Sequence, residues 1–383
     1  FEAAQQWWEM GHATNLAEFE AALRDIRIPM FTIMYTDRDG NILHVFNEQV
    51  PVRSTGDWDF WNGTTLLGGE ISLIPGDTSE YLWERVYHPY EDLPRVLNPE
   101  SGWLQNANEP PFTTTLPRPF EPEDFPPYML PDPYIWPRPI TSMRLLHEDE
   151  SITYAELLED KHSTFVELAR LLLDDLIAAA ATSDDELAQQ AAAVLADWDR
   201  RADADSRGAV LFAAWANTHV SGFEAFASPW SLDNPIDSLS GLADPDAAVA
   251  DLIDTAQQLE QLRALGVGMD VAYGDVFRLR FLDSGVDLPA NGTEDLLGSF
   301  RILNFTQDDD LRFRPTQGDS YIAVVEFGET VQAQVLLAYG NATQSGNPHV
   351  GDQLELFAGQ QLRPALLTRE AIEADLNRAE TLD

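Results

Sequence analysis

The chain has 383 residues, of which 44% are hydrophobic, so it can bury one large core or two smaller ones. Its net charge of −42 excludes a phosphate-binding surface for nucleic acid, and no apolar run approaches the ~18 residues that indicate a membrane span. Cysteine is absent, which excludes disulfides, thiolate metal ligands and cysteine nucleophiles.

The N-terminal part predicts helix followed by a hairpin. Residues 1–26 carry apolar side chains at helical spacing after Asn15, a possible cap. The apolar runs 30–36 and 42–46 predict two strands, joined by a tight turn at Asp39-Gly40. Because both arms are largely apolar, we expect the hairpin to be buried on both faces.

Residues 50–140 are rich in proline, glycine and tryptophan, and predict an irregular segment. The prolines between residues 110 and 139 exclude long helices there. A segment this long without regular structure is either disordered or functional, and its many aromatic side chains favour a packed segment over a flexible linker.

The rest of the chain predicts helices and then strands. Thr153 to Glu156 resembles a capping box at the start of a helical region that extends to residue 265. The predicted elements are helices at 178–196, 246–264 and from about Arg369, and strands at 276–281, 321–327 and 331–339. This order predicts an α+β fold rather than a doubly wound parallel sheet. It also suggests three parts: a core part with the hairpin at 1–148, a helical region at 149–268, and C-terminal strands with a closing helix at 269–383.

The segment 98–110 stands out chemically because Gln105, Asn106 and Asn108 lie among turn formers and aromatic residues. Carboxamides donate hydrogen bonds without carrying charge, as an oxyanion site for acyl transfer requires. Asparagine and glycine beside proline are also ordinary turn formers, so the chemistry alone leaves both interpretations open.

Several motifs in order resemble the penicillin acylase family of N-terminal nucleophile hydrolases. The pattern Ser-Gly-aromatic-x-x-Asn-x-Asn-x-x-Pro at 101–111 resembles its oxyanion segment. The other similar stretches are 35–42, 93–99, 340–349 and 361–364, of which the last two resemble the acyl-homoserine-lactone and aculeacin acylase branch. The resemblance covers about residues 8 to 375, and implies part of a four-layer αββα sandwich with antiparallel sheets and a helical insertion.

The resemblance also implies roles for individual residues. In that family the nucleophile is the first residue of the β subunit, a serine exposed by self-cleavage, whose α-amino group is the general base. Asn108 matches the oxyanion asparagine, and Arg138 matches the arginine that orients it, with a surface ion pair as the alternative. Met30 and Phe31 match positions that line the acyl pocket, and ordinary core residues are the alternative.

The chain departs from the family pattern at its beginning. Phe1 cannot act as a nucleophile, so the serine is expected outside this sequence, on a missing N-terminal part of the β subunit beside a separate α subunit. The resemblance then implies an exported, periplasmic or secreted acylase, inactive as this isolated chain. Candidate substrates are acyl-homoserine lactones, lipopeptides and β-lactams. The alternative is a non-catalytic binding or scaffold protein that retains the acylase fold.

We expect no cofactor and no metal site. The histidines do not show metal-ligand spacing, and the Asp308 to Asp310 run predicts a solvated loop rather than a calcium loop. Some relatives bind calcium, but the ligands that would decide this are expected upstream, so calcium is not carried over to this chain.

Overall fold

The computed structural model describes residues 1–53, 55–58, 65–66, 69–70, 74–83, 85–281, 284–376 and 379. They form two compact units. The first unit consists of residues 1–135, 142–148 and 231–235, and the second of residues 136–141, 149–230 and 236–383. The predicted parts 1–148, 149–268 and 269–383 stay a prediction.

The first unit is built on a three-stranded antiparallel sheet in the order β1-β2-β5. Its strands are β1 (Met30–Thr36), β2 (Ile42–Glu48) and β5 (Arg95–Leu97). The predicted hairpin is confirmed: Thr36 pairs with Ile42, and the connecting turn ends at Gly40, whose φ of 84° suits glycine.

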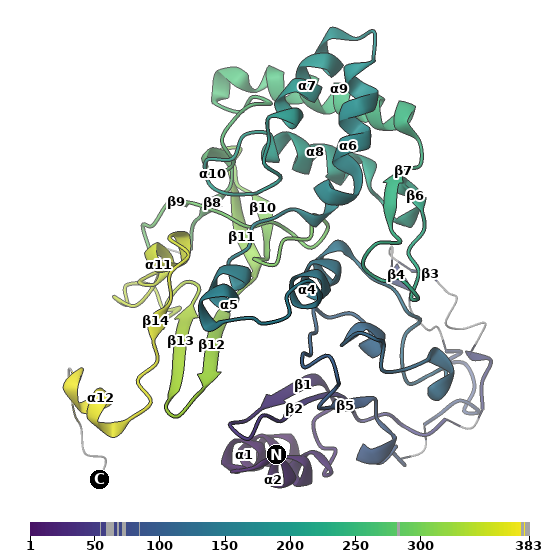
Figure 1. The fold of residues 1–383 in the computed structure, drawn as a ribbon, viewed down its shortest axis with the longest axis vertical. Coiled ribbons are helices and arrows are strands. Elements are labelled where there is room, and N and C mark those ends of the chain that lie inside the picture. The colour runs from purple at the N-terminus through teal and green to yellow at the C-terminus, as the bar shows by residue number, and fades with distance from the viewer. Residues whose placement is uncertain are drawn as a thin grey trace. The chain divides into compact units, whose positions relative to one another are not determined.

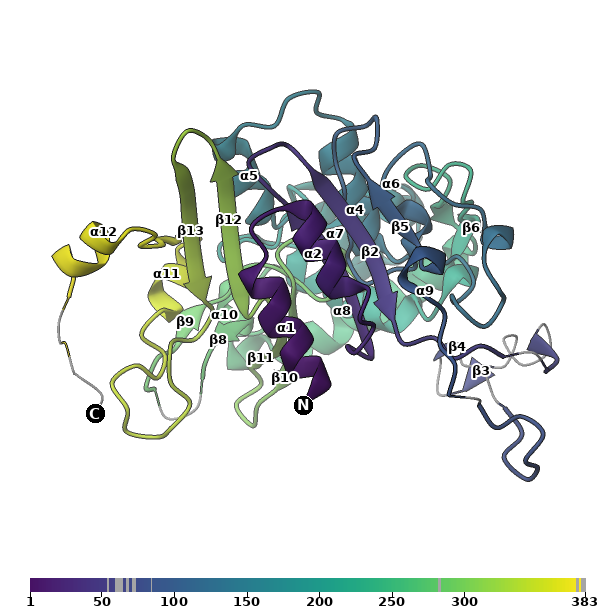
Figure 2. The same cartoon turned by 90° about the horizontal axis from the view of Figure 1, so that it is seen from below.

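Helices α1 (Glu2–His12) and α2 (Leu16–Leu23) lie side by side across one face of this sheet (Figure 2). The predicted cap is confirmed, because Asn15 accepts a hydrogen bond from the Glu18 amide at 3.0 Å. Leu23, Leu43 and Val45 are fully buried between the helices and the sheet.

The prediction that both hairpin arms are buried on both faces is wrong for β1. Ile33 is 5% exposed, whereas Met30, Phe31 and Met34 are 67%, 55% and 47% exposed. Apolar character predicts burial only where another element covers the side chain, and in this chain these three side chains are covered only in part.

The irregular segment is packed, as predicted, over its later described part, whereas Leu82, Trp83 and Val86 are exposed. Its regular pieces are β3 (Thr65–Leu66), β4 (Gly69–Glu70) and the 3-10 turns η1 (Tyr90–Asp92), η2 (Pro111–Thr113) and η3 (Pro122–Asp124). A second apolar core holds it together, made of Val50, Leu93, Phe112, Met129 and Leu130, with Phe120, Phe125 and Tyr128 packed against it.

Helices dominate the first half of the second unit. They are α4 (Pro137–His147), which the two units share, α5 (Tyr154–Lys161), α6 (Glu167–Ala181), α7 (Glu186–Ala196), α8 (Ala209–His219), α9 (Pro245–Gln261) and the short α10 (Tyr273–Val276). Helices α6, α7, α8 and α9 pack against one another (Figure 1). The Thr153 capping box on α5 is confirmed.

The single helix predicted at 178–196 is wrong. The chain leaves α6 at Thr182 and begins α7 after Asp185, whose carboxylate accepts from the Leu187 and Ala188 amides at 2.7 and 3.2 Å. This cap satisfies the free amides of a new helix start, so the alanine-rich run contains two helices. Helix α8 was not predicted separately, because it is apolar on almost every side and has no amphipathic period.

Antiparallel strands form the second half of this unit. They are β6 (Phe226–Ser228), β7 (Ser240–Leu242), β8 (Arg278–Leu279), β9 (Leu288–Pro289), β10 (Leu303–Gln307), β11 (Phe313–Gly318), β12 (Tyr321–Phe327), β13 (Val331–Leu337) and β14 (Arg363–Pro364), with helices α11 (Leu354–Ala358) and α12 (Arg369–Ala374). The strands predicted at 321–327 and 331–339 and the closing helix are confirmed. The strand predicted at 276–281 shrinks to two residues, because α10 occupies its start. The α+β class is confirmed.

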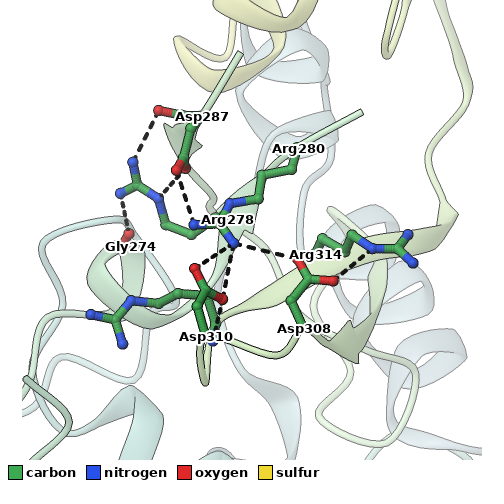
Figure 3. Close-up of polar contacts among 8 residues, drawn as sticks. Gly274, Arg278, Arg280, Asp287, Asp308, Asp310 and Arg314 are labelled. Atoms are coloured by element: carbon green, nitrogen blue, oxygen red, sulfur yellow. Dashed lines mark hydrogen bonds and ion pairs between the residues drawn. The ribbon is translucent and has the colours of Figure 1, made fainter. Parts of the chain in front are cut away.

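A network of ion pairs connects β8 with the β10–β11 turn (Figure 3). The guanidinium of Arg280 contacts the carboxylates of Asp287 at 2.9 Å, Asp310 at 2.9 Å and Asp308 at 3.4 Å. Arg278 and Arg314 hold Asp287 and Asp308 from their other sides, at 2.7 and 2.8 Å. The predicted solvated loop at Asp308 to Asp310 is therefore tied down by arginines.

The network stabilises this part of the second unit at neutral pH. Burial acts to raise the pKa of Asp287, but hydrogen bonds from Arg280 and Arg278 outweigh it and lower that pKa below 3.8. A carboxylate with a lowered folded pKa stabilises the fold above its unfolded pKa, and loses that contribution as acid protonates it.

Replacing Arg280 with methionine should therefore destabilise the second unit. Because its partners are about half exposed and screened by water, we expect a loss of about 1 kcal/mol in the free energy of unfolding, measured with urea at low salt. Molar salt should shrink the difference. The control is Arg369→Met, which removes one exposed pair; an equal loss in both variants would contradict the network's role.

Candidate active site

The segment 105–115 forms a closed loop in the first unit. The Gln105 amide donates to the Thr114 carbonyl at 2.9 Å, and its side-chain nitrogen donates to the Thr113 carbonyl at 2.8 Å. The hydroxyls of Ser101 and Thr115 lie 2.5 Å apart and close the loop further out. These hydrogen bonds hold residue 105 close to residues 113 and 114, and they fix the turn between residues 105 and 110.

Asn108 stands at the tip of this turn. Of residues 107 to 115, all of which the structure describes, Asn108 is exposed while the others are buried. Its φ is 77°, in the left-handed region that asparagine tolerates better than most residues. Its amide donates to the Asn106 side-chain oxygen at 3.0 Å. The local fold thus presents the carboxamide of Asn108 at the surface of this chain.

A buried carboxylate lies directly behind Asn108. Glu109 is 3% exposed, and its two oxygens accept hydrogen bonds from the Gln105 side chain at 2.5 Å and from the Ala107 amide at 2.7 Å. The Asn106 side chain donates to the Glu109 carbonyl at 3.2 Å. Nothing in the sequence distinguished Glu109 from a surface glutamate, because only the folded turn brings the two donors to it.

His44 lies under the same segment. It is fully buried on β2, and its Nε2 lies 3.5 Å from the hydroxyl of Thr114, which is also fully buried. Burial lowers the pKa of His44 from 6.5 to about 4, so its imidazole is neutral at neutral pH. Nothing in the sequence distinguishes this histidine beyond its place in an apolar strand.

Met30 and Phe31 are exposed in this chain, at 67% and 55%. As neighbours on β1 they point to opposite faces of the sheet. Phe31 packs edge-on against Trp7, with ring centroids 5.6 Å apart. Met34 shares the face of Met30 and is also exposed, which makes it a further apolar candidate. The acyl-pocket role of Met30 and Phe31 stays a prediction.

Arg138 belongs to the second unit, in the first turn of α4. Its Nε lies 2.5 Å from the Asp295 carboxylate, and the two side chains are 17% and 48% exposed. The ion pair that was the alternative interpretation of Arg138 is therefore present, and it does not exclude a further contact. The role of Arg138 in orienting Asn108 stays a prediction.

Within the part of the chain that the structure describes, there is no group of three or more histidine or acidic side chains able to hold a metal ion. Among the same residues, no helix is both long enough and apolar enough to cross a bilayer.

The fold is similar to that of a solved amide hydrolase. A thermostable penicillin G acylase from Alcaligenes faecalis matches with a TM-score of 0.59 and 17% identity, over 100% of this chain and 72% of that chain. The similarity shows a penicillin acylase fold, which agrees with the expected fold class. Residues 2–374 match the penicillin amidase family, and the chain belongs to that family of amide hydrolases.

Curated relatives extend this result. The acyl-homoserine lactone acylase PvdQ of Pseudomonas syringae pv. syringae is 25% identical over 97% of this chain, and that of Pseudomonas savastanoi pv. phaseolicola is 26% identical over 97%. In both matches the chain spans 49% of the relative's length, about half. The resemblance recognised from the motifs is thus confirmed.

The buried His44 makes stability depend on pH. Its folded pKa is about 4 and its unfolded pKa about 6.5, so between these values the unfolded chain binds more protons. The stabilisation is complete above pH 6.5 and decreases as pH falls towards 4, by about 3 kcal/mol. Replacing His44 with glutamine should remove this part of the pH dependence.

The measurement is the free energy of unfolding of both proteins at pH 8, 6 and 4.5. At pH 8 the histidine is neutral in both states, which isolates the packing cost of the substitution. The difference between the proteins should then shift in favour of His44→Gln as the pH falls. A constant difference across this range would show that His44 is not held neutral.

Proposed function

We propose that this chain is part of an acylase that hydrolyses the amide between an acyl chain and an amine. Membership in the penicillin amidase family supports the reaction class. The observation that carries the proposal is Asn108, the exposed residue among the otherwise buried residues 107–115, on a turn fixed by hydrogen bonds. An uncharged donor held on a fixed turn is what an oxyanion site requires.

In the proposed reaction, a serine outside these 383 residues attacks the amide carbonyl, and its own α-amino group takes the hydroxyl proton. The Asn108 side-chain N–H donates to the oxygen that becomes negatively charged. Collapse of the tetrahedral intermediate releases the amine, which takes the proton, and water then hydrolyses the acyl-enzyme. All of these groups are protein atoms or water, so the mechanism needs no cofactor.

We infer that Arg138 orients the asparagine and the α-amino group, and that Met30 and Phe31 contact the acyl chain. The accessible apolar surface of Met30, Phe31 and Met34 supports an aliphatic or aromatic acyl group. Relatives named acyl-homoserine lactone acylases favour that substrate class over lipopeptides and β-lactams. The chain would act in quorum quenching if the lactone is its natural substrate.

The proposed assembly follows from the length of the relatives, of which this chain spans about half. We propose that an α subunit and a further part of the β subunit, separated by autoproteolysis, complete the enzyme. The chain alone would then be inactive, and the complete enzyme would be periplasmic or secreted.

The first test replaces Asn108 with alanine in the protein that contains this chain, expressed with its upstream coding region. Loss of an oxyanion donor should lower kcat by about a hundredfold or more, measured as release of homoserine lactone from acyl chains of several lengths. Rates are expressed per processed active site, so a processing defect is counted separately. Unchanged kcat would remove Asn108 from the site.

The second test separates the two roles of Arg138. Arg138→Lys keeps the charge but loses the planar guanidinium, and should lower kcat by about tenfold if Arg138 orients Asn108. Asp295→Asn is the matched control, because it weakens the ion pair and leaves the arginine in place. If Arg138 serves only the ion pair, both variants will lose stability and neither will lose kcat.

A further inference from the structure

The turn that carries Asn108 is built around the buried carboxylate of Glu109, which accepts hydrogen bonds from within the turn itself. Glu109 is 3% exposed, and its oxygens accept from the Gln105 side chain at 2.5 Å and from the Ala107 amide at 2.7 Å. Burying a carboxylate is costly, and a turn can be closed by uncharged residues at less cost. The arrangement therefore calls for an explanation beyond closure of the turn.

The two oxygens of Glu109 hold the chain on both sides of Asn106. One binds the side chain that starts the turn, at Gln105, and the other binds the amide immediately before Asn108. The amide of Asn108 is itself held by the Asn106 side chain at 3.0 Å. The direction of the Asn108 side chain depends on the peptide units at 107 and 108, and these hydrogen bonds fix both units.

The Gln105 side chain shows how specific this arrangement is. Its nitrogen donates both to Glu109 and to the Thr113 carbonyl at 2.8 Å, while its buried oxygen has no hydrogen-bond partner among the residues that the structure describes. Two acceptors on one side of the amide group fix its orientation, because a flipped amide would place its oxygen against both of them. The two oxygens of a carboxylate at position 109 can accept from both Gln105 and Ala107. With a carboxamide at this position, its nitrogen would face one of these two donors and could not accept a hydrogen bond from it.

We propose that Glu109 is the positioning residue of the oxyanion site, acting through the backbone to aim the Asn108 carboxamide at the developing negative charge. This inference rests on the proposed role of Asn108. Through these hydrogen bonds, Glu109 shapes the turn at Gln105 and Ala107. Its function is geometric, and small displacements of an oxyanion donor are costly to the rate.

The main test replaces Glu109 with glutamine, which has the same size but cannot accept from both donors with the present orientation of Gln105. Because Asn108 acts on charge that exists only in the transition state, kcat should fall by about ten- to a hundredfold while KM stays nearly constant. Glu100→Gln, at an exposed glutamate in the same segment, is the matched control and should keep wild-type kcat and KM.

A double-mutant cycle shows whether Glu109 acts through Asn108. In the Asn108→Ala background, Glu109→Gln should cause little further loss of kcat, because the donor that it positions is gone. An equal loss in both backgrounds would overturn the proposal and assign Glu109 to the general fold. Wild-type kcat in Glu109→Gln, with Asn108→Ala inactive, would overturn the positioning role alone. Wild-type kcat in Asn108→Ala would overturn the proposed site and this inference together.

A milder variant guards against misfolding. Gln105→Met removes one of the two donors to Glu109 and keeps the Ala107 contact, so it should lower kcat less than Glu109→Gln and also without a change in KM. Thermal unfolding and the yield of processed protein are measured for every variant. If the variants fold and the kcat loss in Gln105→Met persists unchanged without Asn108, the positioning role is wrong.

Discussion

The constraint on which the proposed site depends is burial of the chain around Asn108. The loop 105–115 packs its residues inward, where Phe112 joins the second core of the first unit and Thr114 meets His44. Within residues 107–115 the exposed position is Asn108, which has a positive φ of 77°. Packing therefore delivers a polar donor to the surface on a rigid support, as catalysis of acyl transfer demands.

Two kinds of buried polar group sit beneath this turn, and they behave differently. Burial keeps the His44 imidazole neutral, so it can pack against Thr114 without bringing a charge near the site. Glu109 is also buried, but each of its oxygens is bound by an N–H group. The first group limits the range of pH in which the unit is stable, and the second specifies the shape of the turn. Both buried polar groups therefore lie next to the turn that the proposed chemistry requires to be well ordered.

In the second unit, acidic side chains are held by ion pairs with arginines. Arginines and aspartates alternate around Arg280, so the acidic run at Asp308 to Asp310 is tied to neighbouring strands. In a chain with a net charge of −42, concentrating the few basic residues in such a network limits the repulsion between carboxylates. Arg138 follows the same pattern through its pair with Asp295. A structural ion pair and an orienting role are compatible in one arginine.

The sequence by itself determined the family, the α+β class, the hairpin and the caps at Asn15 and Thr153, because these follow from local spacing and motif order, and it singled out Asn108 as a candidate. The tertiary structure decided the features that depend on contacts between distant segments of the chain. It exposed Met30 and Phe31, divided the alanine-rich run at Asp185, buried Glu109 within the segment 105–115, and buried His44 against Thr114 of the same segment. Burial is set by contacts between residues far apart in the chain, so a glutamate in a turn and a histidine in a strand look ordinary until the segments that cover them are in place.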